Sequence, residues 1–91
     1  MTAPLSVELT LYGAFRAHVG GAPLRLTLPA GATLADARRE LGAAVRARAP
    51  GFSDDALIAV SAFADERRLL RDDTPLADGA AIAVLPPICG G

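Results

Sequence analysis

The sequence predicts a small α+β domain in which a mixed sheet of four to five strands packs on one main helix. Three observations support this class. Two stretches near the start, 7–12 and 24–28, alternate strictly between apolar and polar residues. Residues 34–49 have the spacing of an amphipathic helix, and two apolar, strand-like stretches follow at 57–63 and 81–85. A single helix is enough to cover one face of such a sheet.

The two alternating stretches predict a pair of half-buried strands. Val7, Leu9 and Leu11 share one face of the first stretch, and the second, Leu24–Leu28, alternates in the same way up to Pro29. The glycine-containing connection 13–23 joins them, which is typical of a hairpin. This connection is long for a hairpin, so the residues alone leave the register open.

The helical stretch has a clear start and a clear end. Thr33 is a good N-cap, and Asp36 three residues later can complete a capping box. Its apolar stripe consists of Leu34, Ala37, Leu41 and Ala44 or Val45. Arg46 and Arg48 suit the negative pole of a helix that ends before Pro50.

The second half predicts further strands and then a change of character. Leu57–Phe63 is apolar and partly β-branched, so we expect a central strand covered on one side. Leu69-Leu70 is expected to form a short strand, and 72–79 is rich in turn residues. Ala81–Leu85 is expected to be the last strand. The predicted organisation is one domain over residues 1–85, followed by an extended tail, 86–91.

Composition excludes several classes of protein. The net charge is −1 and the isoelectric point is about 5.6, which argues against nucleic acid as a partner, because its phosphates require a basic face. All nine basic residues are Arg. Because there is no Lys, no side-chain amine of this chain can accept an isopeptide bond, and the chain cannot form polymers of itself through lysine.

Localisation is predicted from what the sequence does not contain. The single cysteine excludes an intramolecular disulfide. The segment Met1–Leu5 has no basic region followed by an apolar stretch, so a secretory signal is not expected. No run approaches the ~20 apolar residues of a membrane span. We therefore expect a cytoplasmic protein without a membrane partner.

No group of side chains predicts catalysis or metal binding. His18 is alone in the glycine-rich first loop, where we expect it to be solvated, and it has no metal-ligand neighbour at the usual spacing. The pairs Asp54-Asp55 and Asp72-Asp73 suit turns and helix capping. Gly20-Gly21 is not followed by the Gly-Lys-Ser/Thr of a phosphate loop. Whether the chain counts as an enzyme stays open, and its own terminus is the expected reacting group.

The last six residues, Pro-Pro-Ile-Cys-Gly-Gly, predict a functional tail. Gly90 and Gly91 lack a Cβ and can enter a channel too narrow for other residues. Pro86 and Pro87 hold φ near that of an extended chain, so the tail is expected to project as an arm. At about 3.3 Å per residue it reaches roughly 20 Å, enough to present its carboxylate inside another protein. The alternative is an ordinary frayed terminus.

The predicted element order with a terminal Gly-Gly resembles the ubiquitin-like β-grasp fold. Asp73–Gly79, then an apolar strand, then Pro86–Gly91, resemble the molybdopterin/thiamine sulfur-carrier family, and within it the small subunits of molybdopterin synthase, which serve molybdenum cofactor biosynthesis. Two positions depart from the family pattern. Ala80 stands where an acidic residue is frequent, and Cys89 stands where Ser, Ala or Thr is common.

The resemblance implies a reaction at the terminus. A ubiquitin-activating-type adenylyltransferase would use ATP to adenylate Gly91, and sulfur from a donor protein would then displace AMP to leave a thiocarboxylate. The tail would enter the large subunit of the synthase and give sulfur to a cyclic pterin precursor, in a heterotetramer of two small and two large subunits. Gly90 would fit the channel. This chain would bind no cofactor of its own.

The resemblance also implies a partner-binding surface at and near the tail. Pro86, Pro87, Ile88 and Cys89 would lie along the partner. Exposed apolar residues beside the last strand would extend this surface, and Phe63 and Leu85 are the candidates, although either fits a core position as well.

Cys89 has two interpretations. It is either a tolerated small residue or a thiol that forms an acyl disulfide with the thiocarboxylate or a mixed disulfide with a sulfur donor.

Three other functions are compatible with the sequence. The chain could carry sulfur for thiamine, cysteine or tRNA thiolation, which use carriers of the same fold and ending. It could be a protein modifier conjugated to substrate lysines. It could also be a noncatalytic interaction module with an incidental tail.

Overall fold

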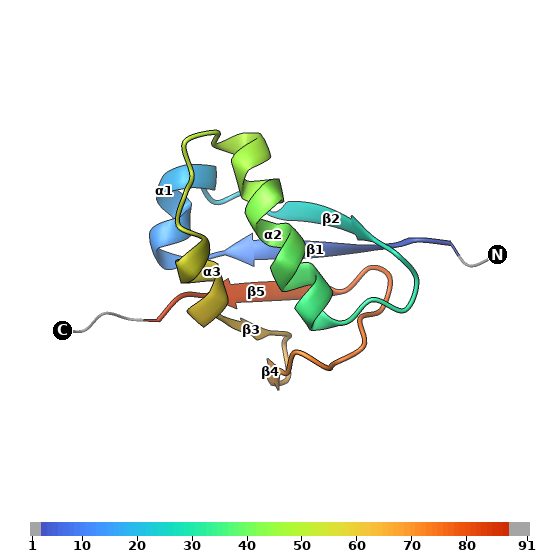
Figure 1. The fold of residues 1–91 in the computed structure, drawn as a ribbon. Helices are drawn as coiled ribbons and strands as arrows, with labels where there is room; N and C mark the ends of the chain where they lie inside the picture. Colours follow the sequence, from blue (N-terminus) through green and yellow to red (C-terminus); the bar gives the residue numbers. More distant parts are fainter. Residues whose placement is uncertain (1–2, 88–91) are drawn as a thin grey trace.

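The computed structural model describes residues 3–87 and confirms the α+β class. The strands are β1 (Leu5–Leu11), β2 (Leu24–Leu28), β3 (Ala62–Ala64), β4 (Leu69–Leu70) and β5 (Ala81–Leu85). The helices are the 3-10 turn η1 (Gly13–Phe15), α1 (Arg16–Val19), α2 (Leu34–Arg48) and α3 (Asp55–Val60). The strands form one mixed sheet in the order β2-β1-β5-β3-β4, and α2 crosses one of its faces (Figure 1).

The predicted hairpin is present, and its register is now defined. β1 and β2 are antiparallel, with Leu5 opposite Leu28 and Leu9 opposite Leu24. The connection between them is not a simple loop, because it contains η1 and α1. Phe15 in this connection is fully buried. Its ring packs at 6.3 Å, centroid to centroid, from that of Phe52, so the connection forms part of the core.

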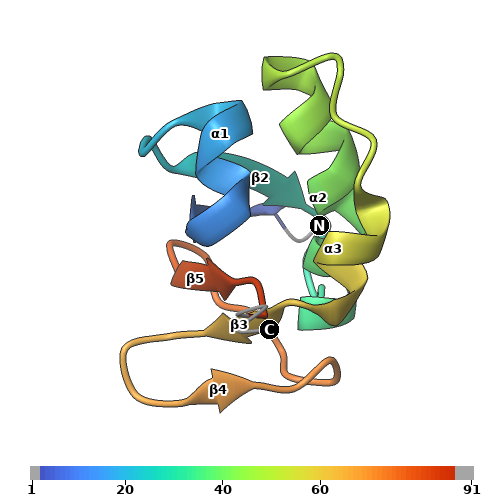
Figure 2. The same cartoon turned by 90° about the vertical axis from the view of Figure 1, so that its left-hand side faces the viewer.

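The last strand of the chain occupies the middle of the sheet. β5 runs parallel to β1, with Leu11 opposite Val84, and antiparallel to β3, with Phe63 opposite Val84. Figure 2 shows the sheet nearly edge-on, with α2 and α3 on one side of β5 and β3. Because β1 and β5 are parallel, both strands finish at the same end of the sheet, and the chain leaves the domain at this end.

The core lies between α2 and the strands. Alternate residues of β1, β2 and β5 point toward the helix, as the period-2 pattern predicts. The largest fully buried side chains are Phe15, Phe52, Phe63, Leu9, Leu11, Leu28, Leu34, Leu41, Val7, Val45 and Val84. Within residues 3–87, neither α2 nor α3 covers the opposite face of the sheet, which is termed the helix-free face (Figure 2).

The predicted start of α2 is confirmed in detail. The Asp36 carboxylate accepts hydrogen bonds from the Thr33 backbone N–H at 2.9 Å and from its hydroxyl at 3.3 Å, which closes a capping box. Arg39 forms an ion pair with the same carboxylate. The backbone hydrogen bond from Thr33 is the main cause that lowers the pKa of Asp36, and the Arg39 charge adds to it. The helix ends at Arg48, before Pro50 as expected.

The prediction of a strand over Leu57–Phe63 is wrong for its first half. Residues 55–60 form α3, and the strand β3 begins only at Ala62. The helix starts because Asp54 caps it, accepting a hydrogen bond from the Leu57 N–H at 3.2 Å. Val60 is 63% exposed, whereas a central strand would have buried it. A short apolar run fits a helix or a strand equally well by periodicity.

Arg38 connects α2 to the end of α3. Its Nη1 donates to the carbonyl oxygens of Ile58 at 2.9 Å and Ser61 at 2.8 Å, at the C-terminal end of α3. Its Nε and Nη2 donate to the Asp72 carboxylate at 3.2 and 3.1 Å. The guanidinium carbon lies 4.6 Å from the centre of the Phe63 ring. Arg38 therefore joins three segments of the chain through hydrogen bonds and ring stacking.

The acidic residues singled out in the sequence have structural roles. Asp54 caps α3, Asp55 pairs with Arg46 of α2 at 2.9 Å, and Asp72 pairs with Arg38. Asp78 accepts a hydrogen bond from the Ser6 N–H at 2.7 Å.

None of the helices in residues 3–87 has the length and apolar character needed to span a lipid bilayer.

Candidate functional site

The candidate site lies where the central strand ends. Leu85, the last residue of β5, is opposite Ala62 of β3. On the other side, the Tyr12 N–H donates to the Val84 carbonyl at 3.1 Å. β5 is therefore held by both neighbours up to its end. Pro86 and Pro87 follow at once, and because neither has an N–H, ladder pairing cannot continue through them.

A glycine lies against the first of these prolines. Gly13 directly follows Tyr12 and has φ of +60°, a backbone conformation that residues other than glycine rarely adopt. A Cβ built on Gly13 would stand 2.7 Å from Cγ of Pro86 and 3.5 Å from its Cδ. Pro86 is partly buried and Pro87 is exposed. The chain therefore leaves the sheet in close contact with the β1–η1 turn.

The helix-free face of the sheet beside Pro86 carries two exposed apolar side chains surrounded by short ones. Tyr12 is 42% exposed and Leu85 is 37% exposed, and the strand alternation directs both away from α2. The other positions on the face that lie near them are small: Ala62, Ala64, Ala81 and Ala83. A shallow hollow of about 220 Å³ lies on this face, bordered by Thr10, Tyr12, Ala83 and the acidic residues Asp65 and Glu66.

Asp65 stands at the rim of this hollow with a fixed carboxylate. It accepts hydrogen bonds from the backbone N–H groups of Arg67 at 2.8 Å and Arg68 at 2.9 Å. These two bonds are the main causes that lower the pKa of Asp65. The rim of the exposed face therefore carries a stable negative charge above the range in which this carboxyl titrates.

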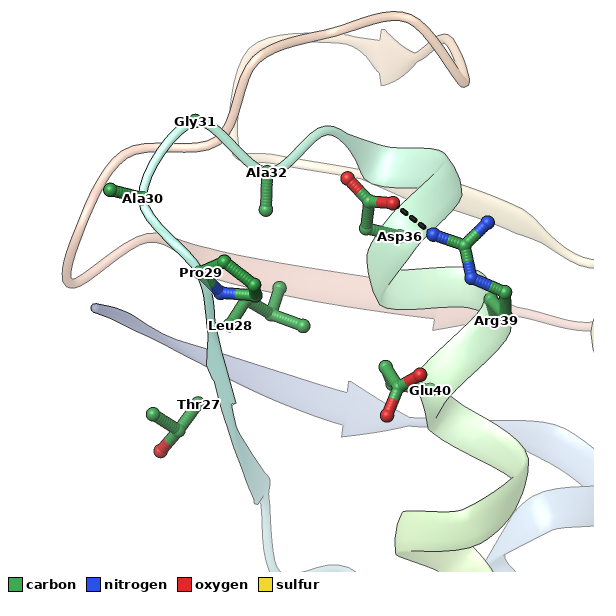
Figure 3. Close-up of a pocket in the computed structure, with 9 residues that line it drawn as sticks. All are labelled: Thr27, Leu28, Pro29, Ala30, Gly31, Ala32, Asp36, Arg39 and Glu40. Atoms are coloured by element: carbon green, nitrogen blue, oxygen red, sulfur yellow. Dashed lines mark hydrogen bonds and ion pairs between the residues drawn. The ribbon is translucent and has the colours of Figure 1, made fainter.

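Two other hollows lie away from the chain exit. One, of about 350 Å³, lies between the end of β2 and the start of α2, and Asp36, Arg39 and Glu40 line it (Figure 3). Leu28 in this hollow pairs with Leu5 at the start of β1, so it lies at the opposite end of the sheet. Its Asp36 belongs to the capping box and pairs with Arg39.

The other hollow, of about 470 Å³, lies between α2 and α3. Its arginines Arg38 and Arg46 are already paired with Asp72 and Asp55. Within residues 3–87 no group of three or more His, Cys, Asp or Glu side chains is placed to hold a metal ion. His18 is exposed and lies edge-on to Phe52, 5.0 Å between ring centres.

A comparison with protein-family models shows to which family the chain belongs. Residues 9–91, nearly the whole chain, match the model of the ThiS family. The chain belongs to the ThiS family. This confirms the resemblance to the sulfur-carrier family that the sequence predicted. No curated protein sequence gives a significant match.

Solved structures of the same fold agree with this ThiS-family assignment. SAMP1 of Haloferax volcanii, a small archaeal modifier protein, is 25% identical with a TM-score of 0.70, covering 94% of this chain and 99% of that one. A putative molybdopterin converting factor subunit 1 of Pyrococcus furiosus is 25% identical with a TM-score of 0.65, covering 92% and 99%. The ubiquitin of Caldiarchaeum subterraneum, at 18% identity, TM-score 0.63 and coverage of 98% and 100%, shares the fold.

The structure separates the two surface residues predicted for this ThiS-family chain. Leu85 is exposed beside the exit, as expected of a surface residue. Of the two positions left open for Phe63, surface or core, the structure shows the core, because its side chain is 1% exposed and packs under Arg38. Phe63 faces α2 because it lies opposite Val84, another core residue. A direct contact of Phe63 with a partner is therefore not proposed.

Four predicted tail residues, Ile88, Cys89, Gly90 and Gly91, lie outside the described residues. Their roles stay predictions, as do those of Pro86 and Pro87. Tyr12 and Gly13 were not among the predicted site residues. A signal for Tyr12 was available, because it ends the alternating stretch 7–12 on the face opposite Val7, Leu9 and Leu11. No local signal tied Gly13 to Pro86, since the two are brought together only by the parallel pairing of β1 and β5.

Proposed function

We propose that this ThiS-family chain is a sulfur carrier of molybdopterin synthesis whose Gly91 carries the sulfur as a thiocarboxylate. One observation carries the proposal: the central strand β5 is followed directly by Pro86-Pro87 at the end of the sheet, beside an exposed apolar face, and the family match continues to Gly91. The proposal requires that the mature chain ends at Gly91. The similarity to a putative molybdopterin converting factor subunit supports the choice of pathway.

The proposed chemistry uses the terminal carboxylate in two steps. A carboxylate oxygen of Gly91 attacks the α-phosphorus of ATP on a ubiquitin-activating-type enzyme, and pyrophosphate leaves. The resulting mixed anhydride has a good leaving group, so sulfide from a donor protein displaces AMP and leaves the thiocarboxylate. That sulfur then bonds to a cyclic pterin precursor bound by the synthase large subunit, and water cleaves the acyl–sulfur bond, which restores the Gly91 carboxylate. General acids and bases belong to the partners.

The partners are proposed to bind the helix-free face beside the exit. Tyr12 and Leu85 provide exposed apolar area there, and the alanines of β3 and β5 leave room for a partner's side chains. Aromatic and aliphatic anchors of this kind carry much of the energy in protein interfaces. A partner on this face can reach the tail without disturbing the core, since the core lies on the other side of the sheet.

Intact-mass spectrometry tests the carrier chemistry. The chain is incubated with the activating enzyme, ATP and a sulfide source, and a mass shift equal to one oxygen-to-sulfur exchange is expected at Gly91. A chain lacking Gly91 is the control and stays unchanged. An unshifted mass under conditions where the enzyme consumes ATP would contradict the proposal. Capture of a synthase large subunit, rather than a thiazole or cysteine synthase, by the immobilised chain tests the pathway.

A second candidate function is conjugation to other proteins, and the similarity to SAMP1 favours it. In that case the activated Gly91 carboxylate would be attacked by a lysine amine of a target. Because this chain has no lysine, its conjugates would carry no lysine-linked polymers of it. Isopeptide-linked targets in peptide mass maps would support this function, and a pool containing only free thiocarboxylate would exclude it.

Cys89 is proposed to be a tolerated small residue in the tail. Cys89→Ser is therefore expected to retain full thiocarboxylate formation and full sulfur transfer. A loss of transfer in Cys89→Ser, with normal adenylation, would instead assign the thiol a relay role through an acyl disulfide.

A further inference from the structure

We propose that Gly13 is a positioning residue for the C-terminal arm: its bare Cα is the seat of the Pro86 ring and sets the direction in which the chain leaves the sheet. The inference rests on the proposed function for its consequence and on the Gly13–Pro86 contact for its geometry. A Cβ at position 13 would stand 2.7 Å from Pro86 Cγ, well inside the 3.5–4.0 Å separation at which two carbons attract best.

The seat is fixed from both sides. Leu11, two residues before Gly13, is 2% exposed in the core, and Phe15, two residues after it, is fully buried. The Gly13 carbonyl accepts the backbone hydrogen bond of Arg16. The Phe15 N–H also donates to the Tyr12 carbonyl, at 3.4 Å. Gly13 therefore cannot retreat from a clash without moving buried groups.

The proline is held equally firmly. Its predecessors in β5 pair with β1 and β3, and the Tyr12 N–H donates to the Val84 carbonyl only two residues before Pro86. A five-membered ring also cannot rotate away as a flexible side chain would. A methyl group at position 13 would thus be relieved mainly by turning the backbone at Pro86, which redirects everything that follows.

Glycine is needed at position 13 for two separable reasons, and a matched control distinguishes them. Gly13 has φ of +60°, so any side chain adds backbone strain. Gly31 has φ of +85° but has nothing within 4 Å of an added Cβ, and it lies in the β2–α2 connection at the other end of the sheet. Gly31→Ala therefore carries the backbone strain alone, whereas Gly13→Ala carries strain and the clash.

The first experiment measures the contact without any partner. Urea unfolding gives the folding equilibrium constants of Gly13→Ala, Pro86→Ala and the double variant. Since Pro86→Ala removes Cγ, Gly13→Ala is expected to reduce the constant at least fivefold less in that background than in the wild type. Equal reductions in both backgrounds would show that the Pro86 ring and Gly13 do not interact, and would overturn the proposed contact between them.

The second experiment measures the direction of the arm. A nitroxide label on Cys89, the single cysteine, broadens the amide signals of the residues that the arm approaches in the full chain. The set of broadened amides is expected to change in Gly13→Ala and to stay as in the wild type in Gly31→Ala. The same set in all three chains would overturn the positioning role, whatever the reaction of the terminus.

The third experiment connects direction to chemistry. In ATP–pyrophosphate exchange with the activating enzyme, Gly13→Ala is expected to lower kcat on the order of 10- to 100-fold through misplacement of the carboxylate. KM is expected to stay within about twofold, because the docking face is intact, and Gly31→Ala is expected to match the wild type. If the wild type shows no exchange, the carrier proposal fails, while the first two experiments still decide the seat. An unchanged kcat in Gly13→Ala would overturn its role in the reaction.

Discussion

The two ends of the sheet are closed by different kinds of contact. Where β1 begins, hydrogen bonds tie the loops together: Asp78 binds the Ser6 N–H, Ser6 accepts from Gly79 at 2.7 Å, and Leu34 donates to Thr74 at 2.9 Å. Where β1 and β5 end, the Tyr12 N–H donates to the Val84 carbonyl at 3.1 Å. Beyond that bond the contact is steric, a proline ring against a glycine, beside exposed apolar side chains. The first end stabilises the fold, and the second presents the chain to partners at little cost to stability.

The sharpest test of this difference is a change confined to the tail. Gly90→Val, or removal of Gly91, is expected to reduce sulfur transfer by at least about 100-fold, since a misplaced or missing reacting group costs this much in rate. The melting temperature is expected to stay within about 1 °C of the wild type, because surface and terminal changes rarely affect stability. Transfer and melting are measured on the same preparation. Normal transfer by either variant would refute the role of the tail.

The next comparison is between two apolar residues that the sequence treated alike. Phe63→Ala removes a buried ring and is expected to destabilise the fold by about 3–5 kcal/mol, whereas Leu85→Ala is expected to cost less than about 1 kcal/mol in urea unfolding. Leu85→Ala should instead weaken binding of the activating enzyme, measured by titration calorimetry. Equal stability losses for the two variants would mean that the exposed face is not separate from the core.

A smaller effect is expected from the connection between α2 and α3. Arg38→Met keeps the apolar stem but removes the donors to Ile58, Ser61 and Asp72, and should cost about 1.5–3 kcal/mol, typical of hydrogen bonds with a charged partner. Arg39→Met, with its side chain 68% exposed, is the matched control and should cost under about 0.5 kcal/mol. Amide hydrogen exchange is expected to show faster opening of α3 in Arg38→Met alone.

These comparisons also show what the sequence could reveal. Alternation in β1 and β2 predicted the core face, and the Thr33–Asp36 pair predicted the start of α2, because both signals depend on neighbours in the chain. The tail was prominent for the same reason. The β1–β5 pairing is long-range, so the contact of Gly13 with Pro86 had no local sign. The role of Arg38 likewise had no local sign, because its partners lie about 20 or more residues away along the chain.

Segment 57–63, which was predicted to be a strand, illustrates a second limit of predicting structure from sequence. Its apolar run is too short for periodicity to separate helix from strand, and the deciding feature was the preceding Asp54, which caps α3. The Asp54-Asp55 pair predicts turns and capping, and the helix that follows it is the consequence of that capping. Capping signals before a short apolar run should therefore be weighed ahead of β-branching.

The smallest expected effect is a pH dependence at the hydrogen-bonded end. The pKa of Asp36 is lowered in the folded chain, first by the Thr33 backbone hydrogen bond and then by Arg39. A carboxyl whose folded pKa lies below its unfolded value, about 3.9, stabilises the fold above that value, and this contribution is lost as pH falls through the folded pKa. Asp36→Asn is therefore expected to be less stable than the wild type at pH 7, with the difference disappearing toward pH 2.

Urea unfolding of both chains between about pH 2 and pH 7 measures this difference. Asp73→Asn also removes one carboxylate, but from a side chain that is 81% exposed, and as the control it should change the free energy of unfolding at pH 7 by less than about 0.5 kcal/mol. A difference between Asp36→Asn and the wild type that stays constant with pH would mean that the capping box acts through shape and not through the charge of its carboxylate. The end of the sheet that is closed by hydrogen bonds would then resemble the steric end more closely than its contacts suggest.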